Sequence, residues 1–192
     1  MSTCDECRST FSKKFEESDE RVRKIDEAHP NAVCEQHCVS VLSPGWVEDG
    51  EELYRAAFSP LHLETNGELK PDVFFSDAFQ GGCSCDRKNY TSEDEVVSKA
   101  IEKAEKDNDA GKKHKTFSHL VAMSVEPLRK INFQCSGSRA LAVYDTATEE
   151  NRAHAEIFVV FSNSKSSKLG RAAKAGLRNQ LLKAAEKIEI SQ

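Results

Sequence analysis

Hydrophobic positions recur with helical spacing at three places along the chain. The first predicted helix covers residues 8–28, and Pro30 stops it from continuing. The second covers about 93–106, where Ser92 and Glu95 fit a capping box. The third covers 166–188 and has an apolar stripe formed by Leu169, Ala173, Leu177, Leu181, Ala184 and Ile188.

Short apolar or alternating runs between these helices predict strands. The clearest are 139–145 and 154–161, and 117–125 is a third. Weaker candidates are 38–42, 52–58 and 72–79, the last being either a strand or an aromatic-rich turn. Because regular β-α-β alternation is absent, we expect an α+β protein with a mixed or mostly antiparallel sheet and flanking helices.

The chain has 192 residues, which suits one domain with a small appendage. We expect a cysteine-rich helical arm over residues 1–38 and an α+β domain over 39–192. The chain has no run of apolar residues long enough to cross a membrane, and its first residues lack the basic start and apolar core of a secretory signal. These features favour a cytoplasmic protein that has no membrane contact and keeps its cysteines reduced.

Two short-spaced cysteine pairs flank the first predicted helix. Cys4 and Cys7 lie in "CDEC", and Cys34 and Cys38 lie in "CEQHC", where His37 is a possible substitute ligand. Four thiolate or imidazole ligands in two such pairs are typical of a structural zinc site. The predicted zinc would clamp the helical arm at both ends. Free or buried cysteines, and a redox pair, remain alternatives.

Charge is unevenly distributed along the chain. Residues 111–192 hold 14 Lys/Arg and 7 Asp/Glu, a net charge of +7, whereas residues 1–110 hold 13 and 25, a net charge of −12. The two halves can attract each other within one fold, or the second half can form a surface that binds an anionic partner. No aromatic residue is interleaved with the basic ones near the C-terminus, which gives base stacking little support.

Candidate chemistry lies on two predicted strands. His154 and Glu156 are two residues apart and therefore face the same way, which suits acid–base work or an ordinary solvated pair. Arg55 follows Tyr54 in an otherwise apolar strand, where an arginine pairs with a carboxylate or holds an anionic ligand.

We expect a shared ligand cleft built from arginine and histidine at strand edges. Its predicted members are Arg55, His62, Arg87, Arg139 and His154, with Tyr54 beside them. A second expected anion contact is the start of the last helix, where Lys168 and Arg171 add charge to the helix N-terminus. A plain solvated helix face is the alternative there.

Several short motifs between residues 52 and 158 form a pattern. They are Arg55, Pro60 with His62, Ser76 to Phe79, Ser84, and Asn151 with His154 and Ala155. This pattern resembles a family of small uncharacterised bacterial proteins, although the chain departs from it at Asp77 and Cys85 and adds the cysteine arm. The resemblance implies no activity.

The order Arg55, Ser76 and Glu156 is similar to that of the ADP-ribosyltransferases of the Arg-Ser-Glu type. This resemblance implies NAD-dependent transfer with these three residues as catalytic groups. The chain departs from that family at position 154, where His replaces the first residue of its Glu/Gln-x-Glu motif.

Three hypotheses for function follow from the sequence. The leading one is a cytosolic, zinc-stabilised protein whose basic second half binds nucleic acid or a nucleotide-like ligand. An ADP-ribosyltransferase-like enzyme is the second. The third is a non-enzymatic interaction or immunity factor that docks a protein partner through its acidic first half.

Overall fold

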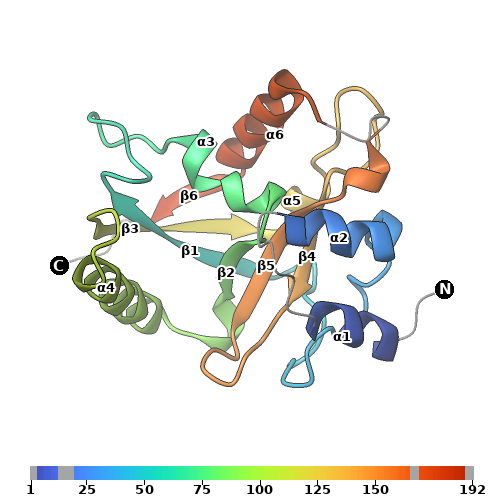
Figure 1. Cartoon of the computed structure of the whole chain (residues 1–192), viewed down its shortest axis with the longest axis horizontal. Coiled ribbons are helices and arrows are strands. Elements are labelled where there is room, and N and C mark those ends of the chain that lie inside the picture. Colours follow the sequence, from blue (N-terminus) through green and yellow to red (C-terminus); the bar gives the residue numbers. More distant parts are fainter. Residues whose placement is uncertain (1–3, 13–19, 165–168, 189–192) are drawn as a thin grey trace.

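The computed structural model describes residues 4–12, 20–164 and 169–188 (Figure 1). Its centre is one curled, six-stranded sheet in the order β4-β5-β2-β1-β3-β6, and every neighbouring pair is antiparallel. The predicted α+β class is confirmed. The strands are β1 (Glu52–Ser59), β2 (Cys83–Arg87), β3 (Thr116–Ser124), β4 (Leu141–Asp145), β5 (His154–Val159) and β6 (Ala185–Ile188).

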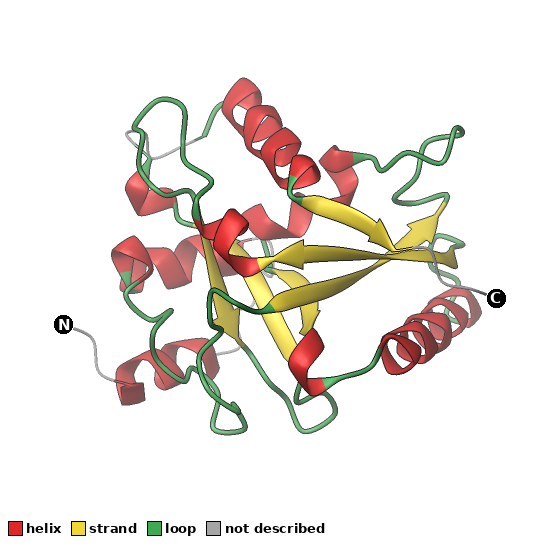
Figure 2. Cartoon of the chain, turned by 180° about the vertical axis from the view of Figure 1, so that it is seen from behind, coloured by secondary structure: helices red, strands yellow, loops and turns green. Residues whose placement is uncertain are grey.

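Helices cover both faces of this sheet. In the described residues the α-helices are α1 (Cys4–Ser12), α2 (Arg21–Ala28), α3 (Pro71–Phe74), α4 (Glu93–Asp109), α5 (Val125–Arg129) and α6 (Arg171–Lys183). One face packs against α3, α5 and α6. The other face packs against α4 at one end and against α1 and α2 at the other (Figures 1 and 2).

The largest hydrophobic core lies between the sheet and the group α3, α5 and α6. Alternate strand residues such as Leu53, Met123 and Ile157 point to this side, as the two-residue period of a strand requires. They meet Phe74 of α3 and Leu181 of α6, both fully buried. Burial of these large side chains contributes roughly 2 kcal/mol each, which fixes the register of the sheet.

The opposite face carries smaller cores at its two ends. Helix α4 begins with the predicted capping box, in which the Ser92 hydroxyl accepts from the Glu95 amide and the Glu95 carboxylate accepts from the Ser92 amide. Its Val96 packs on Tyr54. At the other end, Ile25 of α2 packs beside Tyr144 and Phe158. The start of β5 and its neighbours on β2 lie between these helices.

Most predicted elements are confirmed, and the exceptions have local causes. Residues 38–42, predicted as a strand, form turns and bends. Residues 72–79 form α3 and a 3-10 turn, because Pro71 starts a helix well. Of the predicted helix 8–28, the described residues belong mainly to α1 and α2, and residues 13–19 lie outside the described part of the chain. The predicted helix 166–188 ends early, and its last residues pair with β3 as β6.

The cysteine-rich arm is integrated into the rest of the chain. The Glu35 carboxylate is 4% exposed and accepts hydrogen bonds from Arg129, Arg139 and the Val143 amide. The division into an arm over 1–38 and a domain over 39–192 stays a prediction, but the described part of the arm shares a core with β4 and β5. Among the described residues, no helix has the length and apolarity needed to cross a membrane.

Candidate functional site

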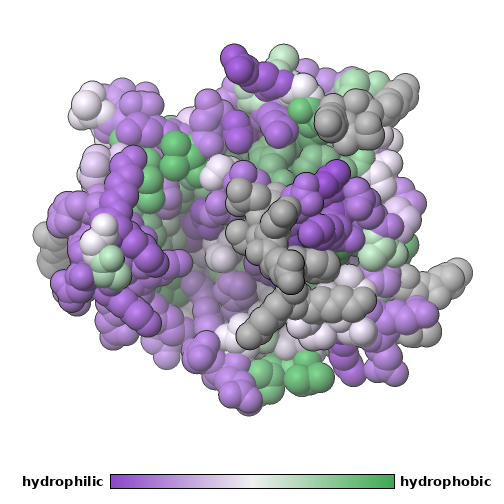
Figure 3. Space-filling model, in the orientation of Figure 1, coloured by the Kyte–Doolittle hydropathy of each residue, from purple (hydrophilic) through white to green (hydrophobic). Residues whose placement is uncertain are grey.

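A cavity of about 370 Å³ opens on the sheet face between α4 and β2. Figure 3 shows this face of the molecule, with a recess between α4 at the left and the centre. The polar and charged side chains of the lining are Tyr54, Arg55, His62, Asp77, Ser84, Asp86, Lys99, Lys103, Lys115, Asn151 and His154. We call this cavity the cationic pocket.

The pocket exists because β1 and β2 separate. Their ladder contains two pairs, Leu53 with Arg87 and Tyr54 with Asp86, after which β1 continues along β3 and β2 continues along β5. Arg55 reaches across the resulting gap. Its guanidinium donates to the Ser84 carbonyl at 2.7 Å and to the Phe74 carbonyl at 2.8 Å. Arg55 therefore satisfies the Ser84 carbonyl of β2 where the β1–β2 ladder has ended, and it ties β1 to α3 through the Phe74 carbonyl.

Arg55 has one ion-pair partner among the described residues, and that partner is half exposed. Arg55 itself is 8% exposed, and its nearest carboxylate, that of Asp77, lies 3.4 Å away with a side chain that is 53% exposed. The Arg55 Nε atom is buried and finds no hydrogen-bond partner among the described residues. A buried guanidinium normally has its donors satisfied and its charge paired, so this arrangement favours an additional anionic partner.

Three lysines add positive charge to the same cavity. Lys99 and Lys103 project from α4, and Lys115 precedes β3. Lys115 is paired with Asp107 at 2.5 Å. The pKa of Lys103 is lowered, first by loss of hydration against the pocket wall and then by the charges of Lys115 and Arg55. The cations repel one another, and an anion between them would relieve that repulsion.

The positive charges of the pocket also affect His62. Burial lowers its pKa to about 3, and the charges of Arg55 and Lys115 contribute. The Phe58 amide donates to its Nδ1 atom at 3.3 Å. The ring is therefore neutral at physiological pH and carries its proton on Nε2, which makes it a hydrogen-bond donor rather than a general acid.

Tyr54, Asp86 and His154 form a row across three neighbouring strands, because they are register partners on β1, β2 and β5. The Asn151 amide donates to the Asp86 carboxylate at 2.5 Å. The Nδ1 atom of His154 lies 2.8 Å from the Thr146 hydroxyl and 3.1 Å from the Thr146 carbonyl. Since a carbonyl accepts and never donates, Nδ1 carries the proton, and Nε2 is the acceptor.

The structure brings together part of the predicted site. Arg55, His62, His154 and Tyr54 all line the cationic pocket, as the shared-cleft prediction requires. Ser84 and Asn151, two further residues of the bacterial pattern, line it as well. The resemblance itself stays a prediction.

Other predicted residues lie elsewhere. Arg87 is 1% exposed and is paired with Glu51 and Asp145, and Arg139 is paired with Glu35. These two arginines are structural, which corrects their place in the predicted cleft. Arg171 begins α6, which packs on the opposite face of the sheet. Lys168 lies outside the described residues.

The Arg55, Ser76 and Glu156 order does not produce one site. Glu156 accepts two hydrogen bonds from Arg21, at 2.8 and 2.9 Å, and borders a second cavity of about 470 Å³. The Ser76 hydroxyl donates to the Val73 carbonyl at 2.9 Å. Neither Ser76 nor Glu156 lines the cationic pocket with Arg55. The catalytic trio is therefore not assembled here, although His154 lines both cavities.

Sequence reasoning missed Lys99, Lys103 and Lys115. A signal was present for two of them, since Lys99 and Lys103 are four residues apart on a predicted helix and adjoin its apolar face at Val96 and Ala100. These lysines line a pocket only because β1 and β2 separate, and no local sequence pattern predicts that separation.

The uneven charge of the chain is partly neutralised inside the fold. Arg129, Arg139 and Arg178 of the second half pair with carboxylates of the first half. The pocket cations come from both halves, with Arg55, Lys99 and Lys103 in the acidic half and Lys115 in the basic one. The basic second half therefore supplies only part of the positive charge of this site.

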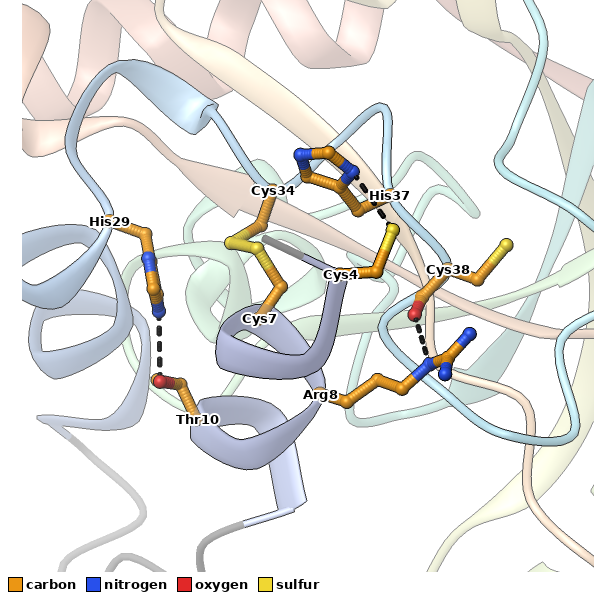
Figure 4. The surroundings of a disulfide bond; sticks show 8 residues. All are labelled: Cys4, Cys7, Arg8, Thr10, His29, Cys34, His37 and Cys38. Carbon is orange, nitrogen blue, oxygen red and sulfur yellow. Dashed lines mark hydrogen bonds between the residues drawn. A yellow bond between two sulfur atoms is a disulfide. The ribbon is translucent and has the colours of Figure 1, made fainter. Parts of the chain in front are cut away.

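The cysteines form a separate cluster (Figure 4). Cys7 and Cys34 are joined by a disulfide, with their Cα atoms 5.6 Å apart and both residues fully buried. The expectation of reduced cysteines is wrong for this pair. His29 lies beside them, and the ligand atoms of the three residues lie within 4.8 Å of one another. Cys7, His29 and Cys34 could together hold a metal ion.

The predicted four-cysteine set is only partly assembled. Cys4 and Cys38 do not belong to the group around Cys7 and Cys34. The Cys4 sulfur instead lies 3.2 Å from His37 Nδ1, and the side chain of Cys38 points away (Figure 4). His29, which replaces them, was not predicted, because it precedes Pro30 outside both cysteine motifs.

Comparisons with protein-family models, with curated proteins and with solved structures find no match for this chain. The fold and the site therefore carry the functional argument. They define an α+β protein with a cationic pocket on one sheet face and a cysteine–histidine cluster at one end.

Proposed function

We propose that this protein binds a nucleotide-like phosphate ester in the cationic pocket. The observation that carries this proposal is the buried guanidinium of Arg55. Among the described residues it has one carboxylate partner, at 3.4 Å and half exposed, and its Nε atom has no hydrogen-bond partner. Phosphate oxygens are strong hydrogen-bond acceptors, and their negative charge would pair with the positive charge of this guanidinium. Lys103 and Lys115 would contact the same phosphate.

The remaining wall of the pocket favours an organic phosphate over a bare inorganic anion. Phe58, Leu61, Val96 and Ala100 supply apolar surface beside the cations. A volume of about 370 Å³ lies in the range of small-molecule sites, which combine apolar walls with a few convergent polar groups. The donor on His62 and the acceptor on His154 would orient hydroxyl or ring groups of the ligand.

Calorimetric titration with AMP and with adenosine at low ionic strength tests this proposal. AMP should bind about tenfold or more tightly than adenosine, because the phosphate contacts carry the affinity. Lys103→Gln should weaken AMP binding by about tenfold, whereas Lys106→Gln, on the same helix but outside the pocket, should leave it unchanged. Equal affinity for AMP and adenosine would overturn the proposal.

A second titration, with a short single-stranded RNA, distinguishes a protein that binds small nucleotides from one that binds a nucleic-acid polymer. If the protein binds a short RNA but not AMP, and Lys103→Gln leaves RNA binding unchanged, the pocket is not the site. If AMP competes with the RNA, the pocket recognises a nucleotide within either ligand, and the proposal stands.

We also propose that the metal suited to the cysteine cluster is zinc. Zinc prefers thiolate and imidazole ligands, and Cys7, Cys34 and His29 would supply two thiolates and one imidazole. The two thiolates become available only after the Cys7–Cys34 disulfide is reduced. Such a zinc form would agree with the expected cytoplasmic location, where thiols stay reduced.

Elemental analysis of reduced, zinc-treated and desalted protein tests the zinc proposal. It should give about one zinc per chain. His29→Ala should lower the zinc content, and Cys135→Ser, which changes an exposed cysteine outside the cluster, should not. Absence of zinc from the reduced wild type would contradict the proposal.

A further inference from the structure

The buried disulfide has an exposed thiol one helical turn away. Cys4 is the first residue of α1, and Cys7 follows it at the i+3 position. Residues three apart lie on the same side of a helix, about 5–6 Å apart at their Cβ atoms. Cys4 is exposed, whereas Cys7 and Cys34 are fully buried (Figure 4).

A histidine contacts this thiol. His37 Nδ1 lies 3.2 Å from the Cys4 sulfur, within the distance for a hydrogen bond to sulfur. An adjacent imidazole is the usual partner that activates a cysteine nucleophile by taking its proton. His37 belongs to the same loop as Cys34, so the loop that holds the disulfide also holds the imidazole beside Cys4.

We propose that Cys4 is the entry point of a thiol–disulfide exchange that opens the Cys7–Cys34 bond. The Cys4 thiolate attacks Cys7 Sγ, a Cys4–Cys7 bond forms, and the Cys7–Cys34 bond breaks. Cys34 leaves as a thiolate and takes a proton from solvent or from the imidazolium of His37. One thiolate and one disulfide give one thiolate and one disulfide, so no external oxidant or reductant takes part in this step.

The exchange transfers the disulfide from a buried place to an exposed one. A small-molecule thiol such as glutathione cannot approach Cys7 or Cys34 directly, because both are 0% exposed. It can attack the exposed Cys4 of the new Cys4–Cys7 bond and form a mixed disulfide with it. A second thiol then releases oxidised glutathione and leaves both cysteines reduced.

Cys38 offers a matched comparison. It is a free cysteine of the same cluster, half-buried, and its side chain points away from the disulfide (Figure 4). Its contact with α1 runs through its backbone carbonyl, which accepts from Arg8 at 2.9 Å. Loss of the Cys38 thiol should therefore leave the exchange intact.

The test follows the reduction of the oxidised protein by glutathione, with acid quenching and alkylation at successive times. Cleavage after Arg8 places Cys4 and Cys7 in one peptide, so their bond appears as an unalkylated peptide while Cys34 is alkylated. The wild type should pass through this species. Cys4→Ser should slow reduction by about tenfold or more, and Cys38→Ser should not.

Two results would overturn the inference. One is equal reduction rates for the wild type and Cys4→Ser, when both show the same native circular dichroism. The other is disappearance of the Cys7–Cys34 bond with no Cys4–Cys7 peptide at any time, in the wild type and in Cys38→Ser alike. Neither result depends on ligand binding in the cationic pocket.

Discussion

Two residues at the cationic pocket show how burial changes the chemistry of ordinary side chains. Arg55 donates to the Ser84 carbonyl where β1 and β2 part and to the Phe74 carbonyl of α3, and these two bonds fix its guanidinium at the pocket wall. His62 is kept neutral by burial and by neighbouring cations. Both roles follow from where the fold places the two residues, Arg55 in β1 and His62 in the turn after it, and not from the identity of flanking residues.

The pKa of His62 leads to a prediction about acid stability. In the unfolded chain His62 takes up a proton as the pH falls below 6.5, while in the fold it does so near 3. Proton binding therefore favours the unfolded chain in that window, and stability falls as the pH falls. His62→Asn removes this effect, because its amide can still accept from the Phe58 amide and does not titrate.

We expect His62→Asn to lose less stability than the wild type when the pH is lowered. Between about pH 7 and about pH 5, the free energy of unfolding of His62→Asn should fall by up to about 2 kcal/mol less than that of the wild type. Urea denaturation at both pH values measures it. His114→Asn, in the exposed connector, is the control, and an acid dependence equal to the wild type for His62→Asn would refute the assignment.

At the scale of elements, the sequence predicted the helices and strands whose local hydrophobic pattern matches the surroundings they have in the folded protein. The strand around Arg55 and the helix capped by Ser92 are examples. The strand β6 could not be predicted, because "AEKI" continues a helical pattern and becomes a strand through pairing with β3. Residues 38–42 have strand-like composition but find no strand partner among the described residues.

Two glycines give opposite predictions. Gly176 lies inside α6, and an added Cβ would come no closer than 3.8 Å to the nearest neighbouring atom, so Gly176→Ala should stabilise the protein by about 0.5–1 kcal/mol. Gly82 has a φ of +110°, and a Cβ there would lie 2.5 Å from Glu156 Oε1 and from Phe158 Cε1.

Gly82→Ala should therefore destabilise the protein by about 2 kcal/mol or more, because strain and overlap add. Chemical denaturation of both variants measures the two effects. A gain of stability for Gly82→Ala, or a loss for Gly176→Ala, would show that the chain at that position is arranged differently.

At the scale of the whole molecule, charge holds distant segments together. The Glu35 carboxylate joins the cysteine-rich arm to Arg129 of α5 and to Arg139 and Val143 at β4. Removing one partner of a buried ionic cluster leaves the others uncompensated. Glu35→Gln should lower the free energy of unfolding by about 3 kcal/mol.

Glu149→Gln is the matched control, since Glu149 is exposed. Thermal unfolding of the two variants beside the wild type provides the measurement. An unchanged midpoint for Glu35→Gln would mean that the arm does not depend on this ionic cluster.

The candidate site was predictable at those residues that stand out in their own strand or loop. Arg55, His62 and His154 interrupt apolar segments, and the structure places all three at one pocket. Lys99, Lys103 and Lys115 lie among many other charged residues, and their convergence depends on the packing of α4 over β1 and β3. Arg87 and Arg139 were misassigned because a buried ion pair and a ligand contact leave the same sequence signal.

The most direct test of the central claim is calorimetric titration of AMP into the wild type and into Arg55→Lys. One ammonium cannot span both carbonyls and a phosphate, so Arg55→Lys should bind AMP about tenfold more weakly or worse. If Arg55→Lys does not fold, Lys99→Gln with Lys103→Gln replaces it and should weaken binding similarly. AMP affinity unchanged in the folded variant, or no AMP binding by the wild type at low ionic strength, would contradict the account.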